Sequence, residues 1–337
     1  MSGWWRGRRV LVTGGAGFIG SNLVARLLAE SAQVRVVDNL ERGKLTYLGE
    51  NLARVEFLKE DLRQPQVASR GCEGVEVVFH LASKVGGIGY YLKRAGEVFR
   101  ENTLMDHNVW SAALEQGVPY YLYASSAHVY PIDLQRAANT PPIREEQAYP
   151  AAPELSYGWA KLLGEKLIEC TLSDGHPIRA GIPRIVGAYG PHQDIELATG
   201  SAIPVFIRRA LEYPKGKPFV VRGTGRETRS YCYVEDVVEA LLLSVEKLTE
   251  QALVGPVNIG SGGLISIAEL AGTVTRLSGK QIEITYDPSE PTQIWAQAVD
   301  CSYAQRVLGW NAKVSLENGL RASFRDIAKR LPGPGGG

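Results

Sequence analysis

Short runs of apolar residues alternate with longer mixed segments over the first half of the chain. Val10-Leu11-Val12 is one such run, typical of a parallel strand that is covered on both faces. The segment Thr103–Gln116 instead spaces apolar residues such as Leu104, Val109 and Ala113 along one helix face. The predicted strands are Arg9–Thr13, Val34–Asp38, Val55–Leu58, Val75–His80, Pro119–Ser125 and Ile178–Arg184, and another predicted helix is Ser21–Glu30. This alternation predicts an α/β fold, a doubly wound parallel sheet with helices on both faces.

The first predicted strand runs into a group of glycines, Thr13-Gly14-Gly15-Ala16-Gly17-Phe18-Ile19-Gly20. Gly14 permits a tight turn, Gly17 lets the backbone approach a ligand, and Gly20 lets the next helix pack against the strand. The unpaired N–H groups and partial positive charge at that helix start favour a pyrophosphate. The spacing therefore predicts a Rossmann-type dinucleotide site.

The acidic residue that ends the second predicted strand indicates which dinucleotide binds. Asp38 stands at the spacing where a carboxylate meets the adenosine ribose. A carboxylate accepts hydrogen bonds from both ribose hydroxyls but repels a 2′-phosphate, which favours NAD over NADP. Arg35 on the same strand and Arg42 in the next loop leave some NADP binding open.

The alternation loosens after Gly190-Pro191, where proline, glycine and charged residues become more frequent. We therefore expect an NAD-binding Rossmann domain over residues 1–185. Residues 186–330 are expected to form mainly a smaller substrate-binding lobe, with some segments returning to the first domain. The glycine-rich end, residues 331–337, is expected to be a disordered tail.

Composition limits the classes of partner that the chain is expected to bind. The 337 residues carry a formal net charge of +1 with acidic and basic residues mixed, so no nucleic-acid or membrane surface is expected. No apolar run is long enough to span a bilayer, and residues 1–6 lack the apolar segment of a secretion signal. The four cysteines are far apart, and the five histidines show no metal-ligand spacing. These features predict a cytoplasmic enzyme without a metal.

Tyr157-Gly158-Trp159-Ala160-Lys161 carries the catalytic signal. Residues four apart share a helix face, so Tyr157 and Lys161 project together. A phenol titrates near pH ~10 in water, and an adjacent ammonium and the positive nicotinamide ring would lower that value and make a general base. A hydroxyl from the end of the fifth strand would assist it, and either Ser125 or Ser126 suits that position.

Several motifs together resemble those of the extended short-chain dehydrogenase/reductases that modify nucleotide sugars. They are the glycine run, Asp38, Asp61-Leu62, His80-Leu81-Ala82-Ser83, Ser126-Ala127-His128-Val129-Tyr130, the Tyr157–Lys161 pair, Tyr189-Gly190-Pro191 and Arg229–Asp236. The resemblance extends from Arg9 to Trp310 and implies Ser126 as the catalytic hydroxyl. It also implies a homodimer formed through paired helices. Taken with the motifs above, the expected cofactor contacts are Gly14, Gly17, Phe18, Ile19, Asp38, Asn39, Asp61, Leu62, Leu81, Ala82, Ser83, Asn102, Tyr157 and Lys161.

Within that family, His80–Tyr90, Ala124–Pro131 and Pro256–Ser261 look most similar to the GDP-mannose 3,5-epimerases. Those enzymes hold a proton-transferring Cys, and the related dehydratases a Glu, where this chain has His128. A ketone acidifies the hydrogens on its neighbouring carbons, and an imidazole with a pKa near ~6.5 suits their removal. Alternatively, His128 only hydrogen-bonds substrate or backbone. Dehydratases also place an Asp where this chain has Ala127, which weakens a dehydratase assignment of that type.

Three departures from the family pattern affect substrate binding. The epimerases carry a second acid/base Lys after Tyr-Gly-Pro; this chain has none there, so His192, Asp194, Glu196 or Lys84 could replace it. Gly187 stands where an Asn usually lies near the phosphates, and Gln297 where an Arg often clamps the diphosphate. The substrate residues expected are Lys84, Gly86, Gly87, Ser126, His128, Gly187, Arg222, Arg229 and Gln297.

The sequence thus predicts an NAD-dependent epimerase of a nucleotide-linked sugar. It would act through a transient ketone with proton exchange at an adjacent carbon. The alternatives are a sugar-nucleotide dehydratase, a 4-epimerase that flips the ketone, and a substrate without a full diphosphate. A non-catalytic dinucleotide sensor is disfavoured because it has no need of Ser126, Tyr157 and Lys161 together.

Overall fold

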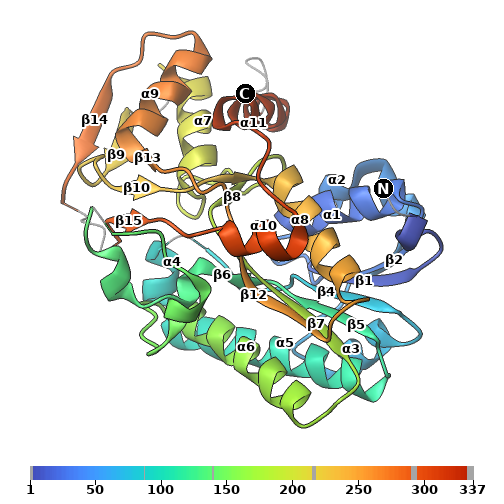
Figure 1. Ribbon diagram of the computed structural model, residues 1–337. Helices are drawn as coiled ribbons and strands as arrows, with labels where there is room; N and C mark the ends of the chain where they lie inside the picture. Colours follow the sequence, from blue (N-terminus) through green and yellow to red (C-terminus); the bar gives the residue numbers. More distant parts are fainter. Residues whose placement is uncertain (1–2, 87, 139, 215–217, 290–293, 332–337) are drawn as a thin grey trace.

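A parallel sheet in the order β12-β7-β5-β4-β1-β2-β3 forms the centre of the molecule (Figure 1), and the short strand β6 extends it by pairing with β7. The computed structural model describes residues 3–86, 88–138, 140–214, 218–289 and 294–331. The strands of this sheet are β1 (Arg9–Thr13), β2 (Gln33–Val37), β3 (Glu56–Leu58), β4 (Val77–His80), β5 (Tyr120–Tyr123), β6 (Ser125–Ser126), β7 (Arg179–Ile185) and β12 (Leu253–Ile259). The predicted doubly wound parallel sheet is confirmed.

Helices cover both faces of the sheet because successive residues of a strand point to opposite sides. Val10 and Val12 belong to the apolar cluster on the face of α1 (Phe18–Ala29) and α8 (Val234–Lys247). Leu11, between them, belongs to a second cluster with residues of the helices on the other face. Those helices are α3 (Pro65–Cys72), α5 (Ala95–Glu115) and α6 (Ser156–Ser173), which lie together beneath the sheet in Figure 1.

Three predicted elements differ from the structure. The helix expected over Ser21–Glu30 begins three residues earlier, at Phe18. The helix expected over Thr103–Gln116 begins eight residues earlier, at Ala95, because its first two turns bury the polar residues Glu101 and Asn102 together with Val98 and so carry no continuous apolar stripe. The strand expected over Pro119–Ser125 divides at Ala124 into β5 and β6, which keep the same register with β7. The other five predicted strands lie within two residues of the observed ones.

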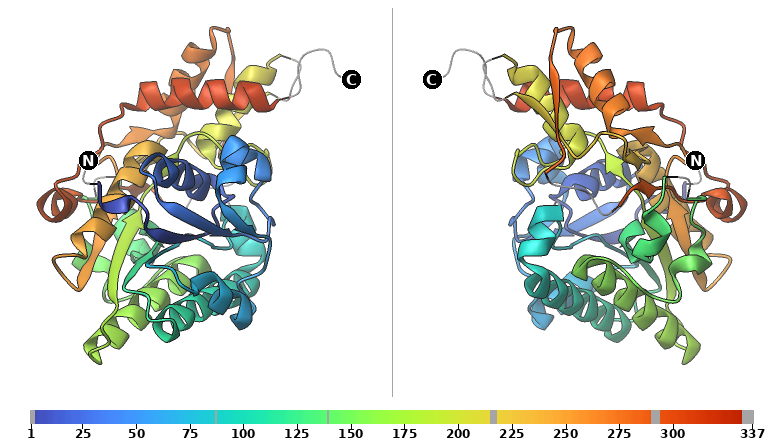
Figure 2. Two further views of the ribbon diagram at one scale, coloured as in Figure 1. Left: turned by 90° about the vertical axis from the view of Figure 1, so that its right-hand side faces the viewer. Right: turned by 90° about the vertical axis from the view of Figure 1, so that its left-hand side faces the viewer.

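Most of the chain after β7 forms a smaller lobe that packs on the Rossmann domain (Figure 2). Its helices α7 (Ala202–Glu212), α9 (Ile267–Ser278) and α11 (Leu316–Arg330) contact one another. The short helices α2 (Leu45–Leu48), α4 (Ile88–Lys93) and α10 (Ser302–Leu308) pack against other elements. Three small sheets complete the lobe: β8 (Ala188–Tyr189) with β11 (Cys232–Tyr233); β9 (Phe219–Arg222) with β14 (Ile284–Asp287); and β10 (Thr228–Arg229) between β13 (Ile265–Ser266) and β15 (Ala296–Gln297).

The later chain also returns to the first domain. Strand β12 pairs with β7 and becomes the edge of the main sheet, and α8 packs against β5, β7 and β12. Apart from Leu331, the tail expected to be disordered lies outside the described residues. Within the described ranges, no helix has the length and apolar character needed to cross a bilayer.

Candidate active site

A cavity of about 660 Å³ opens at the carboxyl end of the main sheet, where the lobe meets it. Thr13, Val37, His80 and Tyr123 lie at one level in the strand register, so the loops that follow β1, β2, β4 and β5 converge there. The predicted residues that line it are Gly14, Gly17, Phe18, Ile19, Asp38, Asn39, Leu62, Leu81, Ala82, Ser83, Lys84, Gly86, Ser126, Tyr157, Lys161 and Gly187. The predicted residues that do not line it are Asp61, Asn102, His128, Arg222, Arg229 and Gln297, and Gly87 lies outside the described residues.

The turn between β1 and α1 has no room for side chains at two glycines. Gly14 has a φ of +68°, and a Cβ there would lie 2.9 Å from the backbone N of Ala82. A Cβ on Gly20 would lie 2.1 Å from the carbonyl oxygen of Gly14. Helix α1 has Gly17 as its N-cap, without a side-chain cap, which leaves the first N–H groups of the helix for a ligand.

Asp38 follows β2 directly and faces the cavity. Its carboxylate accepts hydrogen bonds from the backbone N–H groups of Ala16 (3.0 Å) and Leu40 (2.8 Å), which fix its orientation. Burial raises the pKa of Asp38 above its usual value, against the lowering effect of these two bonds. The remaining lone pairs of the carboxylate suit ribose hydroxyls.

The two arginines that left NADP binding open have other partners. Arg35 pairs with Glu56 at 2.8 Å, and its guanidinium also donates to backbone carbonyls near the end of α3. Arg42 pairs with Asp194 of the lobe at 2.8 Å and donates to the carbonyl of Val85. Both guanidinium groups are therefore committed to protein contacts, which favours NAD.

Tyr157 and Lys161 project from α6 into the cavity, with Ser126 beside them. The phenol of Tyr157 hydrogen-bonds with Ser83 and Ser126; burial raises its pKa to about 12 in spite of these bonds. The Nζ of Lys161 lies 6.0 Å from the Tyr157 ring centroid and is buried. Among the residues that the structure describes, none hydrogen-bonds to this Nζ. Ser125, the other serine considered from sequence, instead donates to the carboxylate of Glu165.

His128 lies beside Tyr157, on the short 3-10 helix Ala127–Val129. Its ring centroid is 5.7 Å from that of Tyr157 and 6.1 Å from that of Tyr91, and Tyr91 stacks on Tyr157 at 5.2 Å. Burial and the charge of Arg229 lower the pKa of His128 to about 4, so the imidazole is neutral at pH 7 and can accept a proton. Gly158 makes this approach possible, since a Cβ there would lie 2.0 Å from the carbonyl oxygen of His128.

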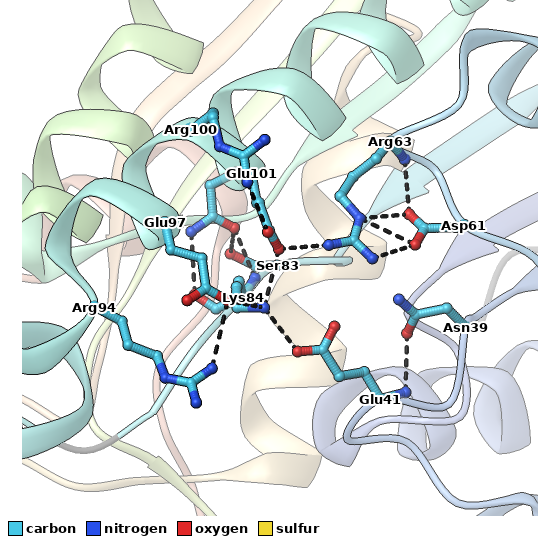
Figure 3. A network of polar contacts seen from close by, with 11 residues as sticks. Asn39, Glu41, Asp61, Arg63, Ser83, Lys84, Arg94, Glu97, Arg100 and Glu101 are labelled. Carbon is cyan, nitrogen blue, oxygen red and sulfur yellow. Dashed lines mark hydrogen bonds and ion pairs between the residues drawn. The ribbon is translucent and has the colours of Figure 1, made fainter.

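Lys84 lines the cavity, but its ammonium faces carboxylates of the loop after β2 and of α5 (Figure 3). Its Nζ lies 2.8 Å from Glu41, 2.8 Å from Glu97 and 2.9 Å from Glu101. Burial lowers the pKa of Lys84, but the hydrogen bonds to the three carboxylates outweigh it and raise the pKa overall. Arg63 joins the same network by pairing with Glu101 at 2.7 Å. The network ties the loops after β2, β3 and β4 to α5.

Two residues expected to contact the cofactor also make hydrogen bonds to these loops. Asp61 accepts hydrogen bonds from Arg63 (Nε to Oδ1, 2.9 Å) and from Asn39, and both lower the pKa of Asp61. Asn102 accepts from the backbone N–H of Lys84 (2.6 Å) and donates to the Lys84 carbonyl (3.1 Å). Both residues therefore hold loops that line the cavity.

Three residues expected to bind substrate belong to the small sheets of the lobe. Arg229 on β10 lies opposite Gln297 on β15, and its guanidinium donates to the carbonyls of Thr228 and Ile294. Arg222 lies exposed at the end of β9, opposite Asp287. Arg229 is thus close enough to affect His128 electrostatically, whereas Arg222 lies in a different sheet.

Sequence reasoning missed two residues of this region. One is Tyr91, described above; the other is Glu154, whose pKa is raised by burial against the charges of Arg136 and Arg229. Neither position carried a signal in the sequence, because Glu154 precedes α6 and Tyr91 follows a glycine-rich segment.

The lobe residues considered as a second acid/base have partners on other elements. His192 stacks on Tyr47 with ring centroids 4.8 Å apart, and its Nδ1 lies 2.8 Å from the hydroxyl of Ser21. The ion pairs of the other two join Asp194 to Arg42 and Glu196 to Arg208. These contacts connect the loop after β8 to α1 and α2.

The residues at the cavity fit a nicotinamide dinucleotide. The glycine turn leaves the backbone of α1 open to phosphates, Asp38 suits a ribose, and the buried Nζ of Lys161 needs a hydrogen-bond acceptor such as a second ribose.

Comparisons with known proteins agree with this geometry. Residues 10–260 match the model of the NAD dependent epimerase/dehydratase family. The chain is 31% identical over 323 residues to GDP-mannose 3,5-epimerase of Arabidopsis thaliana, covering 96% of this chain and 83% of the relative. It is 32% identical over 337 residues to UDP-glucuronic acid decarboxylase 6 of the same plant, covering 97% of this chain and 90% of the relative.

Solved structures include UDP-glucose 4-epimerase from Thermotoga maritima with UDP-glucose. It has a TM-score of 0.84 and 27% identity, covering 96% of this chain and 100% of that one. The resemblance inferred from the motifs is therefore confirmed, including the similarity to GDP-mannose 3,5-epimerase.

Gly20→Ala tests the turn between β1 and α1. The added methyl would collide with the Gly14 carbonyl, so we expect at least roughly tenfold weaker NAD⁺ binding, measured by quenching of tryptophan fluorescence. Gly272→Ala, in a helix with open space around the site, is the matched control and should change stability by no more than about 1 kcal/mol. Equal effects of the two substitutions would contradict this account of the turn.

Lys84→Met tests the network of Figure 3. It leaves Glu97 and the buried Glu101 without their shared cation, so we expect the free energy of unfolding to fall by roughly 2 kcal/mol in urea titrations. Arg94→Met is the control, because this exposed side chain lies 3.4 Å from Glu97 and should contribute about 0.5 kcal/mol or less. A loss as small as that of the control would mean that the cluster contributes little.

Proposed function

We propose that this chain, which belongs to the NAD dependent epimerase/dehydratase family, epimerises a nucleotide-linked sugar through a transient ketone. One observation carries the proposal: the buried phenol of Tyr157 has the hydroxyl of Ser126 as a hydrogen-bond partner and the neutral ring of His128 beside it. That arrangement offers a base for a sugar hydroxyl and a second base for a carbon acid.

In the first step, the Tyr157 phenolate takes the proton of a sugar hydroxyl while Ser126 donates a hydrogen bond to the same oxygen. The ammonium of Lys161 stabilises the phenolate. NAD⁺, when bound, supplies the acceptor for the hydride leaving the carbinol carbon, and later its donor, so the net reaction needs no other oxidant. The substrate carbon becomes a ketone.

In the second step, His128 removes a proton from a carbon beside the ketone. Its imidazole is uncharged at neutral pH because burial and Arg229 disfavour the cation. Return of a proton to the opposite face, followed by return of the hydride, gives the epimer.

A second candidate is a 4-epimerase, in which the ketone turns over and no carbon acid forms. It is favoured by the contacts of the residues considered as a second acid/base. Lys84 is surrounded by carboxylates, and His192, Asp194 and Glu196 each have a partner on another element. Glu154, one of the acids near Arg229, is the proton donor that we assign to the first mechanism, in which a proton must return to the opposite face.

The substrate class rests on relatives and on the lobe. The relatives are named for GDP-mannose and UDP-glucuronic acid, and the solved neighbour was crystallised with UDP-glucose. We assign Arg229, beside Gln297 on β15, to the phosphates of such a substrate. We also retain NAD as cofactor, a cytoplasmic location and a homodimer as parts of the proposal.

His128→Asn tests the carbon-acid step. With NAD-loaded protein in D₂O and candidate nucleotide sugars, we expect wild-type protein to incorporate deuterium at a sugar carbon and the variant to lose at least roughly a hundredfold of that rate. NAD content, measured after denaturation, should stay unchanged. His176→Asn, at a turn before β7, is the control histidine.

Two results would redirect the assignment. Epimer formed without deuterium identifies the ketone-turning mechanism, and a product lighter by one water identifies a dehydratase. Undiminished incorporation by His128→Asn would exclude His128 as the base.

Leu163→Glu tests the homodimer. Phe99 and Leu104 on α5, and Trp159 and Leu163 on α6, are large apolar side chains that remain exposed. If a second copy covers these helices, a charge at Leu163 should convert the dimer to monomer in light scattering after gel filtration. Leu264→Glu, equally exposed in the loop before β13, should leave the mass unchanged. A monomeric wild-type protein would contradict the proposal.

A further inference from the structure

A buried carboxylate lies below the catalytic pair and is not used in the proposed reaction. Asp106 is in the middle of α5 and is 4% exposed. Its carboxylate lies 2.9 Å from His80 Nε2, accepts a hydrogen bond from the Tyr123 hydroxyl at 2.5 Å, and is 3.9 Å from Lys161 Nζ. A carboxylate this well buried is costly unless its charge is balanced and its lone pairs are occupied.

The hydrogen bonds around His80 determine which of its ring nitrogens carries the proton. The hydroxyl oxygen of Thr13 accepts from the backbone N–H groups of Leu81 and Ala82, each at 3.1 Å. The Thr13 proton is then free to be donated to His80 Nδ1, at 2.8 Å. Because Nδ1 accepts this bond, the single ring proton of His80 is on Nε2, which donates a hydrogen bond to Asp106. In this arrangement His80 is neutral, and burial lowers its pKa in the same sense.

The negative charge of Asp106 is left to be balanced by Lys161. The second carboxylate near Lys161 is Glu165, but it already forms a bidentate pair with the buried Arg184, at 2.9 and 2.6 Å, and accepts from Ser125. The Nζ of Lys161, for its part, donates a hydrogen bond to no residue in the described part of the chain. Asp106 and Lys161 thus form a buried pair whose members lie on two different helices, α5 and α6.

We propose that Asp106 is a positioning residue: held by His80 and Tyr123, it keeps the Lys161 ammonium charged and fixed below Tyr157. This inference rests on the proposed function for its purpose, because only a charged Lys161 stabilises the Tyr157 phenolate. The pair itself can be tested without a substrate.

The groups that face Lys161 determine the sign of the effect. They are Asp106 from α5, Tyr157 and Glu165 from α6, Tyr123 from β5 and His80 from β4. Burial lowers the pKa of Lys161, and Asp106, followed by Glu165, opposes that shift. Loss of the Asp106 charge should therefore let Lys161 lose its proton at a lower pH, which makes the phenolate of Tyr157 harder to form. Asp106 also raises the pKa of Tyr157 by direct repulsion, so removal of its charge acts on Tyr157 in the opposite sense as well.

Asp106→Asn in NAD-loaded protein tests the proposal. The titration of Tyr157 is isolated as the absorbance difference near the phenolate band between each protein and its Tyr157→Phe counterpart. We expect the midpoint to rise by roughly one pH unit in Asp106→Asn, as expected for losing a charge partner at this distance. Asp236→Asn, a buried aspartate of α8, should leave the midpoint unchanged.

A double-mutant cycle separates this effect from simple repulsion between Asp106 and the phenolate. In a Lys161→Met background, Asp106→Asn can only remove that repulsion, so the midpoint should fall or stay constant. A rise of the Tyr157 midpoint when Lys161 is present, and no rise in the Lys161→Met background, supports the proposal. An equal fall in both backgrounds would overturn it.

Tyr123→Phe provides a milder variant, should Asp106→Asn unfold in circular dichroism. It removes one donor to Asp106 and should raise the midpoint by a smaller amount; no change would overturn the proposal. The Tyr157 midpoint and sugar turnover are separate measurements. A raised midpoint in a protein that turns over no nucleotide sugar would retain the pair and refute the proposed function.

Discussion

An ammonium group that is shut away from water requires a negative charge nearby, and the site is arranged around one such group. Lys161 is buried on α6 and approaches Asp106 on α5, so two of the helices that cover one face of the sheet each contribute one charge. Asp106 in turn orders His80 at the end of β4 and, through Thr13, the end of β1. The strand ends that form the cavity floor are therefore connected to the catalytic pair by hydrogen bonds as well as by packing.

Two lysines near the cavity show how environment separates residues of one type. Lys84 is surrounded by three carboxylates, which raise its pKa, while the carboxylate paired with Lys161, Asp106, lies farther away at 3.9 Å, and burial lowers the pKa of Lys161. The first arrangement stabilises loops, and the second leaves a proton donor facing the cavity. The identity of the two residues as lysines does not predict this difference, because their partners come from distant segments of the chain.

Local pattern was sufficient for the parts of the fold that depend on neighbouring residues. The strands of the first domain, the glycine turn and the four-residue spacing of Tyr157 and Lys161 follow from periodicity and backbone sterics. The start of α5 does not follow from local pattern, because tertiary contacts stabilise the buried Glu101 there. The surroundings of His128 do not either, since Tyr91 and Arg229 approach it from a helix and from the lobe.

The missing side chain of Gly158 has a consequence for how this site can be changed. The carbonyl of His128 occupies the space that a Cβ at position 158 would fill, so the 3-10 helix with His128 and the first turn of α6 interlock at backbone level. The two segments are thirty residues apart in the chain, yet their backbones fit together as one structural unit. A chimera that exchanges the His128 segment with a relative must carry the start of α6 with it, or the two bases will lose their alignment.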